Sequence, residues 1–286
     1  MMTLSDDPTI IAVVWTYNRF ELACRCIEAV LDQSRPADRV IVVDSASPDG
    51  SGSRLRDTFT EVEVIELPDN GGPGAAISAA FATVGDQLPD YFWLVEDDSF
   101  PQENCLEMAV EQAAQIDQLG ILGPVGCMIK RGQWRATGEL PPGESRAVDF
   151  VVLDGSLVSG EAVRESGYPK TDYFLMMVDV EYPLRMARGG FAMVQVGLPY
   201  RQLRLGAAAE GHSWRNYYQT RNHLRMAIEF RSATLLGGFV LRSLKHLGYA
   251  VGHKDWVSVR YRTRGVVDAL RGRMGRIVEP PAPPTA

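Results

Sequence analysis

Three consecutive acids, Glu96, Asp97 and Asp98, come directly after the apolar run YFWLV at 91–95. Glu96 and Asp98 are two positions apart where a strand is expected to stop, so both side chains can face the same way. Hard cations such as Mg²⁺ and Mn²⁺ prefer oxygen ligands and usually share them with the phosphates of a substrate. The cluster therefore predicts a site for Mn²⁺ or Mg²⁺, with a solvated acidic turn as the alternative.

The elements that must position these acids alternate along the first half of the chain. Nearly continuous apolar runs predict strands, and apolar residues at helical spacing between them predict helices. The predicted strands are 9–15, 39–44, 62–67 and 91–95, and the predicted helices are 20–33, 51–59 and the alanine-rich segment after residue 74. This alternation predicts an α/β fold with a mostly parallel central sheet that is covered by helices on both faces.

Polar clusters follow the carboxyl end of each predicted strand. They are Thr16–Arg19, Asp44, Asn70–Gly74 and Glu96–Asp98. Ligands of such sheets gather outside this edge, so the clusters predict one shared site. The glycines of NGGPG at 70–74 would let backbone N–H groups approach a ribose or a phosphate. A plain strand-to-helix turn is the alternative for this loop.

The second half of the chain is less regular. After about residue 215 it reads as helical, and it ends in PPAPPTA, which we expect to be disordered. We therefore expect an α/β domain over 1–205 and a helical C-terminal extension over 206–286. Between 242 and 276, nine Lys and Arg stand against Asp255 and Asp268, a net charge of +7. Such a basic amphipathic segment can lie on an anionic membrane, with a solvated face or an oligomer contact as the alternative.

Composition limits the partners. The formal net charge of −7 argues against nucleic acid, because phosphate binding usually requires a basic surface. No stretch approaches the roughly 18 apolar residues that span a bilayer, and the start MMTLSDDPT lacks the basic region of a signal peptide. The four cysteines include no CxxC pair, so we expect reduced packing residues. These features predict a cytoplasmic protein.

Taken together, the motifs resemble the inverting GT-A-fold glycosyltransferases of family 2, in particular the branch of bacterial galactofuranosyltransferases and rhamnosyltransferases. The resemblance covers roughly residues 9–276 and follows the order of the family's motifs. Its elements are VVWTYNR, a helix with Leu31 and Gln33, VIVVDSASPDG, DNGGPGAA, WLVEDDSFP, VDFVVLDGSLVS, YFLMMVDVEYPLR and GHSWRNYYQTRN. It implies a GT-A catalytic domain followed by the helical extension.

The resemblance also implies a donor site. The nucleotide-binding positions would be Thr16, Tyr17, Arg19 and Asp44, and those near the ribose and diphosphate would be Asn70, Gly71 and Gly72. Glu96-Asp97-Asp98 occupies the family's DXD position, in which Asp97 would contact the donor and the outer two acids would hold the metal. The family has Asp where this chain has Glu96. His212 falls where the galactofuranosyl branch has a metal-ligating histidine.

The same resemblance implies the catalytic acids. VDVEY matches the family's acidic base motif, with Asp179 at the position of the general base and Glu181 close behind. Many relatives carry another acid where this chain has Val178, which leaves both acids as candidates for the proton abstraction. Acceptor contacts are expected at Trp134, Gly155 and Trp214, with a packing role as the alternative for the last.

The function implied is an inverting transfer of galactofuranose, rhamnose or another hexose from a UDP- or dTDP-sugar to a hydroxyl. The acceptor would be a glycan or a lipid-linked sugar of a cell-envelope polysaccharide, and the protein could be peripheral at the inner face of the membrane. One alternative is a sugar-1-phosphate nucleotidyltransferase, which usually has a glycine-rich basic loop that TYNRFELA lacks. The other is a catalytically silent nucleotide-sugar binding module, against which the intact Asp98 and Asp179 argue.

Overall fold

The central sheet sets the architecture of the chain, which a computed structural model describes over residues 7–203 and 214–279. Its eight strands lie in the order β3-β2-β1-β4-β11-β6-β12-β9. Their bounds are β1 (Ile10–Thr16), β2 (Arg39–Asp44), β3 (Glu63–Glu66), β4 (Tyr91–Glu96), β6 (Leu119–Gly123), β9 (Ser145–Ala147), β11 (Ser156–Ser159) and β12 (Ala192–Val196). The strands expected near the N-terminus are thus present within one or two residues of their predicted bounds.

Strand direction gives the sheet one edge at which most strands end. β1 pairs in parallel with β2 and β4, and β2 pairs in parallel with β3. β11 is antiparallel to both β4 and β6, so β4 and β6 run the same way, and β12 is parallel to β6. The six strands β1, β2, β3, β4, β6 and β12 therefore end on the same side of the sheet. We call this side the carboxyl edge.

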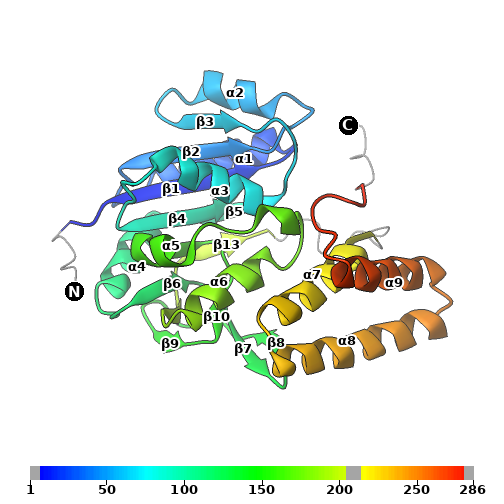
Figure 1. The fold of residues 1–286 in the computed structure, drawn as a ribbon. Coiled ribbons are helices and arrows are strands. Elements are labelled where there is room, and N and C mark those ends of the chain that lie inside the picture. The colour runs from blue at the N-terminus through cyan, green and yellow to red at the C-terminus, as the bar shows by residue number, and fades with distance from the viewer. Residues whose placement is uncertain (1–6, 204–213, 280–286) are drawn as a thin grey trace.

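Helices cover both faces of the sheet because its apolar strands present side chains alternately to each face. In β1, Ile11 and Val13 pack into one core and Ile10 and Val14 into the other. The first core includes α3 (Pro73–Val84), α5 (Gly160–Ser166) and α6 (Val178–Arg188). The second core includes α1 (Phe20–Leu31), α2 (Ser51–Thr58) and α4 (Cys105–Ala113). Figure 1 shows the two helical layers with the sheet between them.

Two small sheets and a 3-10 turn extend the carboxyl edge. One sheet has the order β10-β7-β8 and the other pairs β13 with β5. Their bounds are β5 (Ser99–Pro101), β7 (Gly126–Lys130), β8 (Gln133–Ala136), β10 (Phe150–Val151) and β13 (Tyr200–Gln202), and the turn is η1 (Thr171–Tyr173). The β5–β13 pair brings Tyr200 beside the segment that follows the acids of β4.

Three helices complete the described chain: α7 (Arg215–Glu229), α8 (Ala233–Gly252) and α9 (Trp256–Leu270). α7 packs along α9, and α8 packs against α7 and β8. Figure 1 shows these helices on the side of the sheet toward which the carboxyl edge points. The predicted α/β fold with a helical extension is confirmed. The expected domain boundary at 205/206 and the tail PPAPPTA lie outside the described residues, and the division into two domains stays a prediction.

The expectations on cysteines and membrane spans concern the same described ranges. Cys24, Cys26, Cys105 and Cys127 are all free thiols. Among residues 7–203 and 214–279, no helix is both long and apolar enough to cross a bilayer.

Candidate active site

The acid cluster lies at the centre of the carboxyl edge. Glu96 is the last residue of β4, and Asp97 and Asp98 form the turn before β5. The three carboxylates approach one another within 4.8 Å. Burial raises the pKa of Glu96 to about 8, and the charges of Asp154, Asp98 and Asp97 add to the rise. A compact group of hard oxygen atoms that resists ionisation fits a divalent cation, which would supply the missing positive charge.

The loop after β1 holds the middle acid. Thr16 Oγ1 donates a hydrogen bond to Asp97 Oδ2 at 2.7 Å, and Arg19 Nη1 donates to Asp97 Oδ1 at 2.9 Å. The same Arg19 nitrogen lies 3.7 Å from Asp98. Burial raises the pKa of the Asp97 carboxyl, while Arg19 and Thr16 oppose that rise. The structure thus joins three residues that the sequence assigned to the donor, Thr16, Arg19 and Asp97, to the acid cluster.

Asp154 is a further acid of this cluster that sequence reasoning did not single out. Its carboxylate accepts hydrogen bonds from the backbone N–H of Glu96 at 2.8 Å and from Ser99 Oγ at 2.7 Å. The hydroxyl of Tyr200 also donates to it. Burial raises the pKa of Asp154 to about 6 despite these hydrogen bonds. An acid within the apolar segment VVLDGS was the available signal, and Asp154 fixes the backbone that carries Glu96.

The remaining donor-site predictions fall on the same edge. Asp44, the last residue of β2, accepts a hydrogen bond from Ser47 N at 2.9 Å, and the Ser47 hydroxyl also donates to its carboxylate. Ser47 Oγ in turn accepts the Asn18 backbone N–H at 2.8 Å, so the loops after β1 and β2 are joined. Tyr17 is exposed beside them. Asp44 therefore orders the edge where a nucleotide would lie.

The loop of Asn70, Gly71 and Gly72 is shaped by a close backbone approach. Asn70 Oδ1 accepts the Gly72 N–H at 3.0 Å, and Gly72 has a φ of +80°. A Cβ on Gly72 would lie 1.7 Å from the carbonyl oxygen of Phe174. Only glycine fits there, both by conformation and by space. The loop after β3 is thereby placed against the segment that leads into α6.

Asp179 and Glu181 share the first turn of α6 but face different surroundings. α6 leads into β12, so its first turn lies at the carboxyl edge. Asp179 is exposed, and the protein around it raises the pKa of its carboxyl by desolvation. Burial, and in smaller part the charge of Asp179, raise the pKa of the Cys127 thiol to about 11. Asp179 therefore lies near β7, which carries Cys127.

Glu181, in contrast, is only 1% exposed. Arg185 Nε donates to its Oε1 at 3.1 Å, and Lys170 Nζ lies 3.6 Å from the same oxygen. The carboxylate is thus held in a buried ion-pair group within the protein.

The segment before α6 is strained and is held by α7. Phe174, Met176 and Met177 have φ values of 59°, 65° and 71°, which bulky side chains rarely adopt. Asn222 Nδ2 donates to the carbonyl oxygens of this segment, at 2.8 Å to Leu175 and 2.9 Å to Met176. These bonds fix the approach to Asp179.

Arg221 completes this attachment from the same helix. It is fully buried, and its guanidinium donates to the carbonyl oxygens of Tyr173 at 3.1 Å and Gly275 at 2.6 Å. At the start of α7, Arg215 lies near Arg19: burial and the charge of Arg19 both lower the pKa of Arg215. The first turn of α7 is therefore close to the acid cluster.

The predicted acceptor and metal residues occupy varied places. Trp134 on β8 lies edge-on to His223 at 4.8 Å, with the Arg242 guanidinium 4.5 Å from its ring centre. Gly155 is buried, and a Cβ there would lie 2.6 Å from the Tyr200 ring. Trp214 packs in an aromatic group with Tyr217 and Tyr218 at the start of α7. His212 lies outside the described residues.

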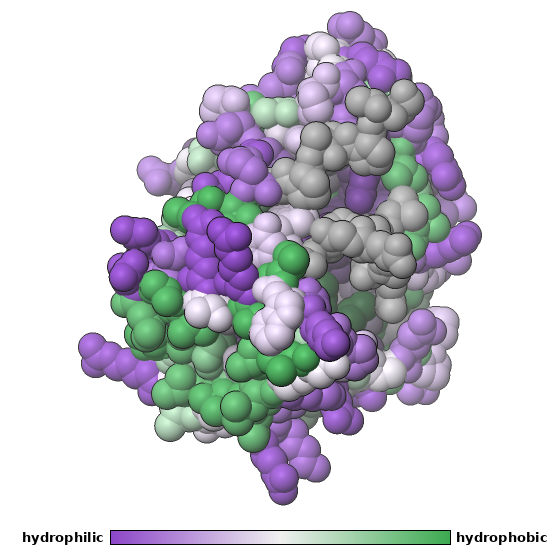
Figure 2. Space-filling model, turned by 90° about the vertical axis from the view of Figure 1, so that its right-hand side faces the viewer, coloured by the Kyte–Doolittle hydropathy of each residue, from purple (hydrophilic) through white to green (hydrophobic). Residues whose placement is uncertain are grey.

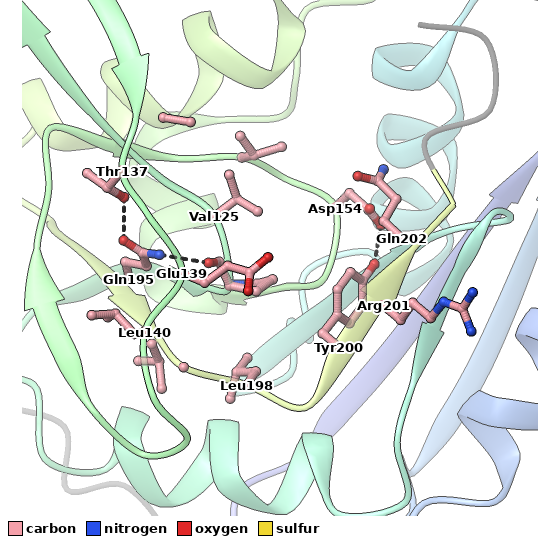
Figure 3. A pocket seen from close by; sticks show the side chains of 15 residues that line it. Val125, Thr137, Glu139, Leu140, Asp154, Gln195, Leu198, Tyr200, Arg201 and Gln202 are labelled. Atoms are coloured by element: carbon pink, nitrogen blue, oxygen red, sulfur yellow. Dashed lines mark hydrogen bonds between the residues drawn. The ribbon is translucent and has the colours of Figure 1, made fainter.

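A pocket opens on the carboxyl edge beyond the acid cluster, where β6 and β12 end. Its volume is about 380 Å³. Its lining includes Val125, Thr137, Glu139, Leu140, Val152, Asp154, Gln195, Leu198, Tyr200 and Gln202. Figure 3 shows Glu139 pointing into the pocket between Gln195 and Tyr200, whereas Arg201 points away. Asp154 lies in the wall and links this pocket to the backbone of Glu96.

Comparison with known proteins places the chain in a family. The model of glycosyl transferase family 2 matches residues 11–153. The galactofuranosyltransferase GlfT1 of Mycolicibacterium smegmatis is 25% identical over 218 residues, which cover 65% of this chain and 68% of that protein. The glycosyltransferase GlyG of Streptococcus pneumoniae is 27% identical over 118 residues, or 40% of this chain and 38% of that protein.

Solved structures share the fold. The mannosyltransferase PcManGT of Pyrobaculum calidifontis, described in complex with GDP-Man and Mn²⁺, superposes with a TM-score of 0.58 and 16% identity, covering 93% of this chain and 88% of that one. TarS residues 1–349 of S. aureus give a TM-score of 0.61 and 14% identity, covering 93% and 82%. The family match argues against a nucleotidyltransferase, and the relatives named as glycosyltransferases support an enzyme over a silent binding module. The chain belongs to glycosyl transferase family 2 and is a glycosyltransferase with the GT-A fold.

Proposed function

We propose that this glycosyltransferase inverts the anomeric centre as it moves a sugar from a UDP- or dTDP-sugar to an acceptor hydroxyl. The observation that carries the proposal is the group of Glu96, Asp97 and Asp98 at the carboxyl edge, with Asp179 separate from it on the same edge. The group of acids would hold the metal ion that accompanies the leaving diphosphate. The separate acid would take the proton from the acceptor hydroxyl. Galactofuranose, rhamnose and other hexoses are the candidate sugars, supported by the similarity to GlfT1.

A divalent cation, Mn²⁺ or Mg²⁺, would be held by Asp98 and Glu96, with His212 as the proposed third ligand. When bound, it would offset the negative charge that develops on the departing nucleotide diphosphate. PcManGT is described with Mn²⁺, which supports Mn²⁺ for this site. Arg19 adds positive charge beside Asp97. Thr16 holds Asp97 in place, and Tyr17, Asp44 and Asn70 line the edge for the nucleotide.

Asp179 acts as the general base in this proposal. Its carboxylate takes the proton from the acceptor hydroxyl while the hydroxyl oxygen attacks the anomeric carbon. The bond from that carbon to the diphosphate oxygen breaks, and its electron pair leaves with the nucleotide diphosphate. The exposure of Asp179 and the raised pKa of its carboxyl support this role. Glu181 instead has a structural role in this proposal, since its carboxylate is bound by Arg185 and Lys170.

The pocket at the ends of β6 and β12 suits one sugar ring of the acceptor. Its 380 Å³ falls within the range of about 300–1,000 Å³ of ligand pockets. Val125, Leu198 and the Tyr200 ring offer apolar surface for a sugar face, whereas Thr137 and Glu139 offer oxygen atoms for its hydroxyls. The carboxylates in this lining favour a neutral ring over a phosphorylated one. Gly155 would act here through its close packing on the Tyr200 ring of the pocket, and Trp134 and Trp214 stay proposed as acceptor contacts.

We also propose that the protein works at the inner face of the membrane, where a lipid-linked acceptor of a cell-envelope polysaccharide would be presented. The net charge of +7 between residues 242 and 276, on a chain whose net charge is −7, supports this location.

The test is donor turnover with and without acceptor in Mn²⁺, in Mg²⁺ and in chelator. UDP-galactofuranose, dTDP-rhamnose and UDP-hexoses are first screened for metal-dependent thermal stabilisation, because a ligand of the native state raises the melting temperature. We expect one donor to stand out and its product to have the opposite anomeric configuration. A product that retains the donor's configuration, or turnover unaffected by chelator, would reject the inverting or the metal part of the proposal respectively.

The pocket has its own test. Glu139→Gln should raise the KM for acceptor several-fold and leave donor affinity unchanged, because Glu139 points into the pocket and away from the acid cluster. Arg201→Gln is the matched control, since Arg201 lies on the rim and points away. Equal effects of the two substitutions would remove the pocket from the acceptor site.

A further inference from the structure

α8 carries a continuous row of exposed aliphatic side chains that the fold leaves uncovered. We call this row the apolar stripe; it consists of Leu236, Val240, Leu244, Leu247 and Val251. Because they recur every three or four residues, these side chains share one side of the helix. Leu244 is 64% exposed at its middle. An adjoining side of α8 carries Leu235 and Phe239, which pack against the protein.

The surface continues beyond the end of α8. Trp256 and Val257, at the start of α9, are also exposed, Trp256 at 61%. Figure 2 faces this end of the molecule and shows apolar side chains gathered over α8 and α9 in its lower half. An exposed tryptophan next to an apolar helix face is typical of side chains at a membrane–water boundary.

The charges around the apolar stripe indicate what kind of partner would cover it. The 20 residues of α8 contain no acid; Lys245 is exposed, whereas Arg242 packs over the Trp134 ring. Lys254 follows in the turn, and Arg260 and Arg264 line a groove of about 530 Å³ beside Trp256. Cations beside an apolar helix face attract anionic lipid headgroups. A second copy of α8 would instead meet these cations with like charges and no acid of its own.

We propose that α8 lies flat on an anionic membrane, with the apolar stripe inserted below the headgroups and the exposed cations Lys245, Lys254 and Arg260 among them. Among the described residues no helix, α8 included, is long and apolar enough to cross a bilayer. The inference rests on the proposed location and gives it a defined surface. It also places the carboxyl edge near the membrane, because α8 packs on α7 and β8 at that side.

The experiment is co-sedimentation of the full chain with vesicles of phosphatidylglycerol and phosphatidylcholine in equal parts, and with vesicles of phosphatidylcholine alone. We expect binding to the anionic vesicles that weakens as salt is raised. Val240→Ser with Leu244→Ser should weaken that binding at least about tenfold, because two apolar side chains no longer insert. Met128→Ser on β7 is the control, compared with Val240→Ser alone: Met128 is 47% exposed and Val240 46%, so the two single substitutions alter apolar side chains of similar exposure.

Three outcomes would overturn the inference. They are no binding of the wild-type chain to anionic vesicles, equal binding of the double variant, and equal loss in the Met128→Ser control. If the lipid-free protein is a dimer that the double variant separates, a second copy covers the stripe and the membrane assignment is wrong. Transfer to a soluble acceptor is measured in parallel and should be unchanged in the double variant. If transfer to the soluble acceptor persists while vesicle binding fails, only the membrane surface is wrongly assigned. If transfer itself is absent from the wild-type chain, the proposed function fails.

Discussion

Two acidic groups lie near the carboxyl edge, and their surroundings differ. At the end of β4, Glu96 is crowded by Asp97, Asp98 and Asp154, and the pKa of its carboxyl is raised to about 8, first by burial. Beside α6, Glu229 is crowded by cations: burial acts to raise its pKa, but the hydrogen bonds from Lys170 and Arg225 lower it. In the first group, Arg19 balances only part of the negative charge, so a bound cation would stabilise the group further. In the second group, Lys170 and Arg225 already balance the charge of Glu229.

The contrast separates function from structure among residues of one chemical type. A group of like charges costs stability and persists where a ligand supplies the opposite charge. Glu181 belongs to the second group, since Lys170 contacts both Glu181 and Glu229. Substitutions in the two groups should therefore act on different quantities, the first on binding and turnover and the second on folding.

The largest effect is expected in the first group. Asp98→Asn should abolish metal-dependent donor binding and lower transfer by at least about 10³-fold, because charge stabilisation by a metal is worth several kcal/mol. The metal-free variant should unfold at the same temperature as the wild type or higher, since one repelling charge is gone. Calorimetric titration with Mn²⁺ and nucleotide, together with a thermal melt, measures both. Retained Mn²⁺-dependent nucleotide binding in the folded variant would refute the metal assignment.

Asp179→Asn tests the isolated acid. Transfer should fall by about 10²-fold, the scale of general-base loss, with donor and metal affinity nearly unchanged. Because desolvation by the surrounding protein raises the pKa of the Asp179 carboxyl, wild-type transfer should decline on acidification at a higher pH than an ordinary aspartate would give. Single-turnover rates across pH and a donor titration provide the measurements. A loss of donor binding in this variant would move Asp179 into the metal site.

Glu181→Gln should act through stability. Removing the charge leaves Arg185 and Lys170 without their buried partner and should lower the free energy of unfolding by about 2 kcal/mol. The folded fraction should transfer sugar at close to the wild-type rate. Urea unfolding and turnover per folded molecule test this. A stable but inactive variant would make Glu181 the base and would erase the contrast between the two acidic groups.

The smallest effect is expected for the buried histidine His223, and it concerns the pH dependence of stability. His223 packs between Trp134 and Phe239, and burial, with the charge of Arg242, lowers its pKa to about 3. The unfolded chain binds a proton near pH 6.5 that the folded chain refuses, so stability is lost as pH falls below that value. The slope is at most about 1.4 kcal/mol per pH unit. His223→Phe should remove this contribution to the slope of unfolding free energy against pH, measured by urea unfolding from pH 4.5 to 7. If the plots for the wild type and the variant run parallel, the assignment to His223 is contradicted.

The regular half of the sheet could be predicted because local patterns determine it. β2 has the predicted bounds, and β1 and β4 end one residue later than predicted, at Thr16 and Glu96. Each strand is buried on both faces and therefore reads as an unbroken apolar run. The carboxyl edge followed from the alternation of strands and helices alone.

The other half depends on contacts between distant residues, which no local pattern records. Tyr200 meets Asp154 across 46 positions, and Arg221 meets Tyr173 across 48. Asp179 and Glu181 look alike as neighbours in the sequence; only the fold shows that one is exposed and the other carries Arg185. The pocket at the ends of β6 and β12 is likewise assembled from four separate stretches of the chain, 124–125, 136–140, 152–154 and 195–202.

The strained segment before α6 has a consequence for the order in which the protein is made. Its carbonyl oxygens are bound by Asn222, 46 positions after Met176, on a helix synthesised after the whole sheet. A chain emerging from the ribosome can pair its strands before that helix exists, because domains fold as their parts become available. The left-handed turn at Phe174, Met176 and Met177 cannot be secured until then. A nascent chain would therefore complete the edge that carries Glu96, Asp97 and Asp98 first and fix Asp179, the proposed base, among the last steps, when α7 has left the exit tunnel.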